Sequence, residues 1–113
     1  MIIYGIKNCD SVKKAIRFCK QNELAYQFHD FREQGITENM LKAWLTSVEW
    51  TTLLNKRSTT FKQLSKQDKD NLTEASALQL MLKYPTLIKR PVVQTETQLI
   101  VGFQQEKFQE LVI

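Results

Sequence analysis

The chain has 113 residues, of which 42% are hydrophobic and 25% charged, and its formal net charge is +4. This length suits a single domain of residues 1–113 with one core, and without a signal-peptide pattern or an apolar run near twenty residues we expect a cytoplasmic protein with no membrane partner. The positive charge suits nucleic acid, but acidic residues interleave through the middle and no nucleic-acid-binding motif is present, so we predict no direct nucleic-acid partner.

The first elements predict a strand, a helix and a second strand. Residues 1–5 are apolar and β-prone, and a helix is expected from Asp10, with Asp10 or Ser11 as its N-cap. Residues 24–31 alternate loosely and are rich in aromatic side chains, which indicates a strand parallel to the first. The apolar face of the helix is predicted to contain Val12, Ala15, Ile16 and Cys19.

The middle of the chain predicts a helical insertion over about residues 36–84. Helices are expected to begin at Thr37 and Thr73, with short helical turns between them, and Pro85 is expected to end the second helix. Trp44 and Trp50 are predicted to fill the core of this insertion. The predicted inward faces are Met40, Leu41, Trp44, Leu45 and Val48 in the first helix, and Ala75, Leu78, Met81 and Leu82 in the second.

The last part predicts two strands and a helix. Residues 92–95 and 98–102 are β-prone and are joined by a tight turn, which is typical of an antiparallel hairpin. A final helix is expected to turn Phe108, Leu111 and Val112 inward. The elements together predict an α/β protein with a mixed four-stranded sheet, a thioredoxin-like topology and a helical insertion within the same domain.

Cys9 stands between the first predicted strand and the helix that follows it. A helix N-terminus carries partial positive charge and unpaired N–H groups, which stabilise a thiolate, the nucleophilic form of cysteine. Lys7 and Lys13 add positive charge nearby. We therefore predict that Cys9 is a reactive nucleophile and that Cys19 is a buried core residue.

Cys9 has no second cysteine close enough to act with it. Val12 stands where a C-x-x-C dithiol has its second thiol, and about 15 Å of helical rise separates Cys9 from Cys19, which is too far for a disulfide. A mixed disulfide on Cys9 must therefore be resolved by an external thiol. Glutathione is the candidate co-substrate, and we predict no bound cofactor.

The remaining polar candidates have simpler explanations. His29 is the only histidine, and a hydrogen bond to Asp30 or to a backbone carbonyl explains it more simply than catalysis. Two separated cysteines and one histidine cannot form a closed zinc site, so we predict no metal. Asn8, beside the thiol, either donates a hydrogen bond to a ligand or caps the turn.

Three segments, "YGIKNCDSVKKA", "LLNKRSTTFKQL" and "LIKRPVV" followed by "LIVGF", resemble the arsenate reductase ArsC/Spx superfamily, and most closely its YffB-like branch, over essentially the whole chain. The resemblance implies a thioredoxin-like fold with a helical insertion, Cys9 as the nucleophile and a glutathione-dependent thiol reductase activity. It also implies that Pro91 is a cis-proline beside the active cysteine and that Arg90 points into the same pocket.

Two departures from the arsenate reductase pattern argue against that activity. Phe103 stands where those enzymes have an arginine that binds the oxyanion, and Arg57 lies two residues later than their middle arginine, at whose position this chain has Asn55. A planar guanidinium shifted by two residues is not expected to bind the same ion. The Spx-type regulators often have a C-x-x-C switch, which Val12 removes, but binding of RNA polymerase uses their surface.

We therefore hold two main hypotheses. The first is a glutathione-dependent thiol reductase in which Cys9 is the nucleophile, Asn8, Lys13 and Pro91 line the site, and Arg57 and Arg90 bind carboxylates. The second is an Spx-like protein that binds RNA polymerase, with an incidental cysteine. Arsenate reduction is the least favoured alternative, and a monomer is expected.

Overall fold

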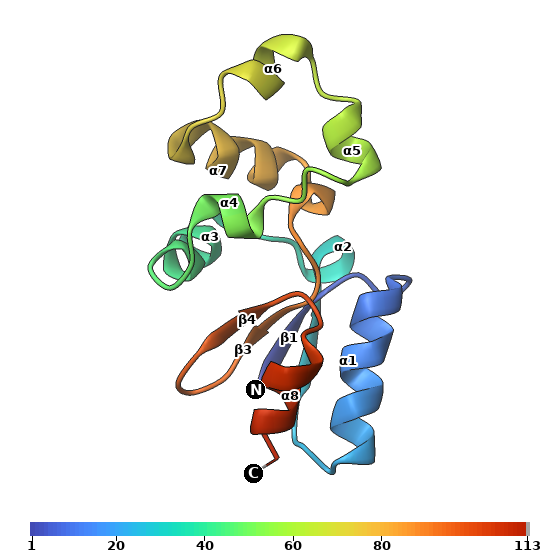
Figure 1. Ribbon diagram of the computed structural model, residues 1–113. Coiled ribbons are helices and arrows are strands. Elements are labelled where there is room, and N and C mark those ends of the chain that lie inside the picture. Colours follow the sequence, from blue (N-terminus) through green and yellow to red (C-terminus); the bar gives the residue numbers. More distant parts are fainter. Residues whose placement is uncertain (113) are drawn as a thin grey trace. The chain divides into compact units, whose positions relative to one another are not determined.

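The computed structural model describes residues 1–112, which form two compact units (Figure 1). The first unit comprises Met1–Gly35 and the chain from Arg90 onward, and the second comprises Ile36–Lys89. Among the helices of residues 1–112, none combines the length and the hydropathy needed to cross a membrane.

The first unit is built on a four-stranded mixed sheet. Its strands are β1 (Ile2–Gly5), β2 (Gln27–Asp30), β3 (Val92–Gln94) and β4 (Leu99–Val101), in the order β2-β1-β3-β4. The β1–β2 pair is parallel, whereas the β1–β3 and β3–β4 pairs are antiparallel. This arrangement confirms the predicted thioredoxin-like topology, with β2 shorter than expected.

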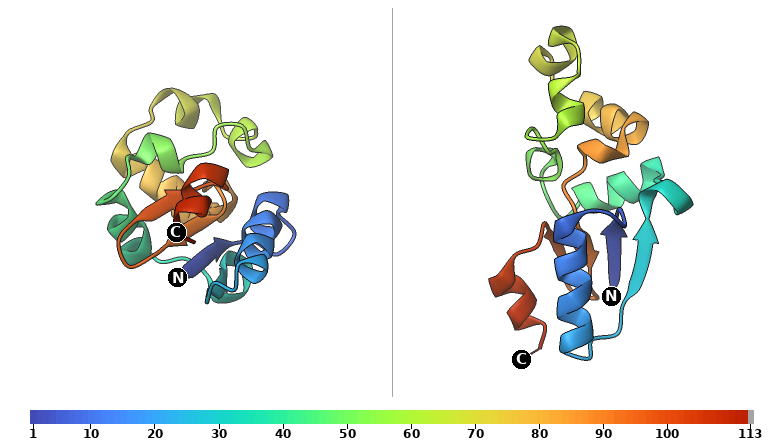
Figure 2. Two further views of the ribbon diagram at one scale, coloured as in Figure 1. Left: turned by 60° about the horizontal axis from the view of Figure 1, so that its bottom comes forward. Right: turned by 90° about the vertical axis from the view of Figure 1, so that its right-hand side faces the viewer.

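Two helices, α1 (Asp10–Gln21) and α8 (Gln105–Glu110), lie on one face of this sheet (Figure 2). Phe108 of α8 packs against Phe103, with ring centroids 4.7 Å apart. The prediction that Val112 points inward is wrong: α8 ends before it, and its side chain is 44% exposed. One core cluster of the unit consists of Ile3, Ala15, Cys19, Val93, Ile100 and Phe108.

The second unit contains only short helices and one isolated β-bridge, between Leu54 and Ile88, within its described residues. The backbone of Lys89 also donates a hydrogen bond to the carbonyl of Leu53, which keeps the segment after Pro85 in this unit. Its helices are α3 (Glu38–Leu45), α4 (Trp50–Leu53), α5 (Thr59–Lys62), α6 (Lys66–Asp70), α7 (Glu74–Lys83) and the 3₁₀ helix η1 (Pro85–Leu87).

The apolar faces of this unit follow the prediction with two exceptions, Trp50 and Ala75. Trp44 is buried, whereas Trp50 is only half-buried. Helix α7 starts immediately after Thr73, and its buried stripe consists of positions 77, 78 and 81. Ala77 therefore faces inward, and Ala75, which the apolar pattern predicts to do so, is exposed.

Candidate functional site

Cys9 is the N-cap residue of α1 and is half-buried. Its backbone is extended (φ −95°, ψ 125°), its N–H donates to the carbonyl of Ile6 at 3.2 Å, and its carbonyl accepts from the N–H of Lys13 at 3.0 Å. The prediction that Asp10 or Ser11 caps the helix is therefore wrong. The turn that closes on Ile6 makes the carbonyl of Cys9 the first acceptor of the helix, so Asp10 already lies within it.

The start of α1 lacks a side-chain cap. No side-chain oxygen accepts a hydrogen bond at this N-cap position, which Ser, Thr, Asp or Asn usually occupies. Cys9 occupies the N-cap position, where the side chain ordinarily accepts a hydrogen bond from an N–H group of the first turn. A thiolate in this position can accept those hydrogen bonds and interact favourably with the helix dipole.

A close contact between β1 and α1 supports this position. A Cβ atom added to Gly5 would lie only 2.5 Å from Cγ2 of Val12, which is fully buried. The end of the strand therefore approaches the first turn of the helix so closely that only glycine fits without a shift. This packing fixes where the loop with Cys9 leaves the sheet.

An ion pair links the β1–α1 loop to the helix α2 (Phe31–Gln34), which follows β2. The Lys7 ammonium donates to Oε1 of Glu33 at 2.6 Å, and this hydrogen bond with the Glu33 charge raises the pKa of Lys7. Both side chains are exposed. Glu33 is not among the residues predicted from sequence. It could have been found, because Lys7 follows β1 and Glu33 follows β2, and the ends of two neighbouring parallel strands lie at the same edge of a sheet.

His29 is occupied by a structural contact. Its Nε2 atom is hydrogen-bonded to the carbonyl of Gly35 at 2.8 Å, and its ring lies 5.0 Å from that of Tyr4, its partner on β1. The backbone of Arg32 donates to the carboxylate of the buried Asp30, which caps α2. The contact with Gly35 confirms the prediction that His29 forms a hydrogen bond with a backbone carbonyl.

Pro91 lies at the same edge of the sheet as the loop that leads to Cys9. The antiparallel register pairs Tyr4 with Val92, so the residue before Val92 stands beside the end of β1. The Arg90–Pro91 peptide bond is cis, as the resemblance implied, and the Pro91 carbonyl accepts from the N–H of Gly102 at 2.7 Å.

The other predicted site residues divide between the two units. Asn8 and Lys13 are exposed on either side of Cys9 in the first unit, and Arg90 leads into β3 of the same unit. Arg57 belongs to the second unit, in the loop after α4, where its N–H donates to Oδ1 of Asn55 at 3.0 Å.

Cys19 is fully buried in the core between α1 and the sheet, as predicted. Burial raises the pKa of its thiol, because an apolar environment disfavours the charged form. Neither cysteine forms a disulfide. Within residues 1–112, His, Cys, Asp and Glu side chains form no group of three that suits a metal ion.

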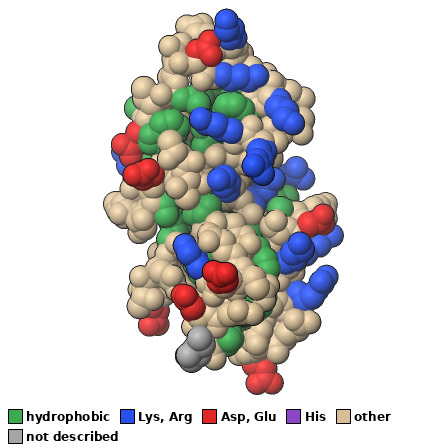
Figure 3. Space-filling model, in the orientation of Figure 1, with side chains coloured by type: hydrophobic (Ala, Val, Ile, Leu, Met, Phe, Trp, Pro, Cys, Tyr) green, Lys and Arg blue, Asp and Glu red, His purple; other side chains and the backbone are tan. Residues whose placement is uncertain are grey.

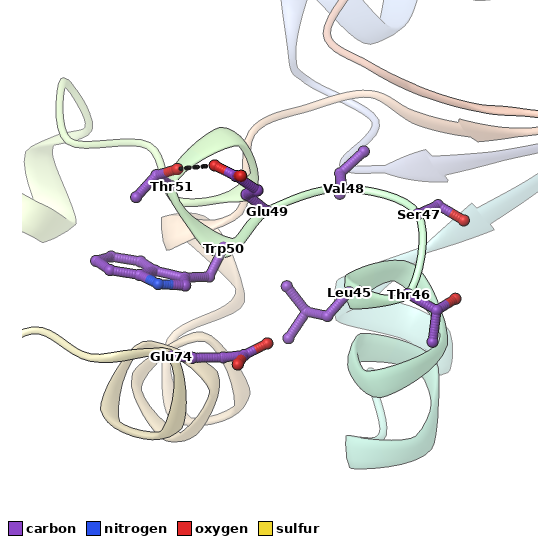
Figure 4. Close-up of a pocket in the computed structure, with 8 residues that line it drawn as sticks. All are labelled: Leu45, Thr46, Ser47, Val48, Glu49, Trp50, Thr51 and Glu74. Atoms are coloured by element: carbon purple, nitrogen blue, oxygen red, sulfur yellow. Dashed lines mark hydrogen bonds between the residues drawn. The ribbon is translucent and has the colours of Figure 1, made fainter.

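The second unit has a hollow of about 520 Å³ between the end of α3 and the starts of α4 and α7. The side chains of Leu45 and Glu74 point toward one another there, the Trp50 ring points away from Leu45, and the hydroxyl of Thr51 donates to the carboxylate of Glu49 (Figure 4). The hollow is open and contains no buried charged group, so its geometry indicates no particular chemistry.

Comparisons with known proteins agree with this architecture. The model of the ArsC family matches residues 4–111. An uncharacterized protein of Haemophilus influenzae is 39% identical over 107 residues, which cover 95% of this chain and 94% of that protein. The global transcriptional regulator Spx 1 of Lactococcus lactis is 30% identical, over 93% of this chain and 83% of that protein. A solved structure of a protein named YFFB matches with a TM-score of 0.94 at 38% identity, covering 99% of this chain and 98% of that one.

Proposed function

The chain belongs to the ArsC family, and from this premise we propose that it is a glutathione-dependent thiol–disulfide oxidoreductase with Cys9 as its single nucleophile. The observation that carries the proposal is the position of Cys9: it is the N-cap of a 12-residue helix that no side chain caps. This position offers N–H groups and a helix dipole to a thiolate.

The proposed reaction is a pair of thiol–disulfide exchanges. The Cys9 thiolate attacks the glutathione sulfur of a mixed disulfide, a Cys9–glutathione bond forms, and the substrate leaves as a thiolate that takes up a proton. A free glutathione thiolate then attacks this bond, oxidised glutathione leaves, and the Cys9 thiolate is regenerated. Because Val12 replaces a second cysteine, the resolving thiol comes from outside the protein.

The surrounding residues have proposed binding roles. Arg90 and Arg57 would pair with glutathione carboxylates through two parallel hydrogen bonds, which a planar guanidinium makes better than an ammonium. Lys13 would add positive charge one turn into α1, and Asn8 would donate a side-chain hydrogen bond. Pro91, at the sheet edge beside the end of β1, would form one wall of the site.

Reaction of Cys9 with iodoacetamide at neutral pH, with a glutathione disulfide present or absent, tests this proposal. Cys19→Ala removes the background thiol, which burial already protects. We expect Cys9 to react about 10-fold faster than glutathione itself and to be protected by the glutathione disulfide, because the thiolate is the reactive form and the helix end stabilises it. A rate equal to that of glutathione, without protection, would contradict the proposal.

A second candidate function follows from the relative in Lactococcus lactis, which is named a global transcriptional regulator. As an Spx-like protein, the chain would bind RNA polymerase through its surface, and Cys9 would be incidental. Cys9→Ser separates the two functions. It should abolish exchange under the first and leave binding to purified RNA polymerase unchanged under the second.

Arsenate reduction remains the least favoured alternative. Phe103 packs in the aromatic cluster with Phe108 and Phe18, with ring centroids 4.7 Å and 6.4 Å away, and so brings no cation to an oxyanion. We expect no arsenate-dependent oxidation of glutathione in the purified protein.

A further inference from the structure

The helix α1 carries four cationic side chains on its solvent-facing side. They lie within about a third of the helix circumference, at 100° per residue, while Val12, Ala15 and Cys19 face the core. Asp10 is the only acidic residue of the helix. We call this surface the basic stripe, and its members are Lys13, Lys14, Arg17 and Lys20, all exposed.

The charges of the basic stripe are not neutralised within the protein. Over residues 1–112, none of these four side chains forms an ion pair within 4 Å, unlike Lys7, which pairs with Glu33, and Lys42, which pairs with Glu38. Figure 3 shows several Lys and Arg side chains at the right edge of the lower half, where α1 lies in Figure 1, and others in the upper half. This surface therefore offers positive charge to a partner.

The length of the stripe indicates the size of that partner. Measured from Cys9 along the helix axis, Lys13 lies about 6 Å away, Arg17 about 12 Å and Lys20 about 16 Å. A tripeptide spans at most about 10 Å, and glutathione is held through the sulfur of its central residue. Glutathione on Cys9 can reach Lys13 but not the far end of the stripe.

We propose that the basic stripe docks an acidic protein segment that carries the disulfide to be reduced at Cys9. The segment would lie along α1, with its cysteine at the start of the helix and its carboxylates beside Arg17 and Lys20. Charge complementarity of this kind accelerates association and selects among partners. The reaction at Cys9 rests on the proposed function, whereas docking on the stripe can be measured without any reaction.

The charge distribution favours a protein over a nucleic acid as the partner. A duplex presents a phosphate charge for about every 1.7 Å of its axis, and its binding needs many distributed cations. In the first unit, cations and carboxylates nearly balance, and the stripe is confined to one face of one helix. A short acidic peptide segment matches that extent.

Binding of a fluorescein-labelled, cysteine-free peptide with four glutamates along twelve residues tests the docking surface. The stripe variant is Lys14→Gln/Arg17→Gln/Lys20→Gln, which leaves Lys13 in place, and the control Lys62→Gln/Lys66→Gln/Lys83→Gln removes the same charge from the second unit. We expect the Kd to rise at least 10-fold in the stripe variant and less than twofold in the control. Equal changes in both variants would overturn the proposal.

Two further measurements complete the test. A DNA duplex that competes with the peptide and shows the same dependence on the stripe would overturn the assignment to a protein partner. For turnover, the kcat/KM of a glutathionylated acidic peptide should fall at least 10-fold in the stripe variant, whereas that of the glutathione mixed disulfide of mercaptoethanol should stay unchanged. The unchanged rate also shows that the variant is folded.

The outcomes separate the two proposals. If the small disulfide is reduced but the stripe variant binds and reduces the acidic peptides as well as the unchanged protein does, the docking surface is refuted and the enzyme function stands. If neither disulfide is reduced while the acidic peptide binds through the stripe, the enzyme function is refuted and the docking surface stands.

Discussion

Four helices of the second unit begin in a different way from the long helix α1 of the first unit. In the second unit, α3, α5, α6 and α7 each begin at a serine or threonine whose hydroxyl accepts a backbone N–H of the first turn; these residues are Thr37, Ser58, Ser65 and Thr73. In the first unit, the long helix α1 begins at Cys9 without such a bond. These four helices have local side-chain caps, whereas α1 packs against the sheet and its first-turn N–H groups have no side-chain acceptor.

Truncation of a core side chain in the first unit has the largest expected effect on the free energy of unfolding. Phe108→Ala should lower the free energy of unfolding by about 3–5 kcal/mol, because the ring is fully buried. Urea unfolding should be followed by far-UV circular dichroism and by tryptophan fluorescence, since both tryptophans lie in the second unit.

We expect both signals to shift together, because a unit of this size made of short helices is marginal alone. A fluorescence midpoint that stays constant while the dichroism midpoint falls would show that the units unfold separately. Phe108→Leu, expected to cost about 1 kcal/mol, keeps the test usable if the alanine variant does not fold.

Gly5→Ala tests the close contact that positions Cys9. The added methyl group meets Val12 at 2.5 Å, so the free energy of unfolding should fall by about 1–3 kcal/mol. The double variant Gly5→Ala/Val12→Ala should be more stable than the sum of the single changes predicts, because the smaller side chain makes room. Additive effects in thermal or urea unfolding would refute the contact.

Loss of a cap in the second unit gives a smaller effect. Thr73 and Ser76 form a reciprocal capping box at the start of α7, with hydrogen bonds of 2.8 and 3.1 Å. Thr73→Ala should lower the free energy of unfolding by about 1 kcal/mol, whereas Thr73→Ser should keep most of it. If the two variants have the same urea midpoint, the cap does not contribute.

Cys9→Ser has the smallest expected effect on stability, and it tests whether α1 lacks a side-chain cap. A serine hydroxyl can cap α1 as it caps the helices of the second unit, so the free energy of unfolding should rise by about 0.5 kcal/mol. Cys9→Ala should show no such gain in urea unfolding. Under the proposed function both variants lose thiol–disulfide exchange, since each lacks the nucleophile.

Much of the first unit could be predicted from sequence, and the errors have local causes. The strands and the burial of Cys19 follow from the apolar pattern along each element. The parallel pair follows from the strand–helix–strand connection, and the antiparallel hairpin from its tight turn. The usual acceptor oxygens predict Asp10 or Ser11 as the cap of α1, but the turn at Ile6 starts the helix one residue earlier. In the second unit, the apolar pattern predicts Ala75 as the inward alanine of α7, whereas Ala77 is the buried one.

The sequence by itself determined the fold class, the position of Cys9 at the start of a helix and the lack of a second thiol, because these depend on neighbours along the chain. Only the tertiary structure decided the Lys7–Glu33 ion pair, the contact of Gly5 with Val12 and the place of Pro91 at the sheet edge. Each of these joins residues through strand register or packing between elements, and such distances are set by the whole core rather than by local pattern.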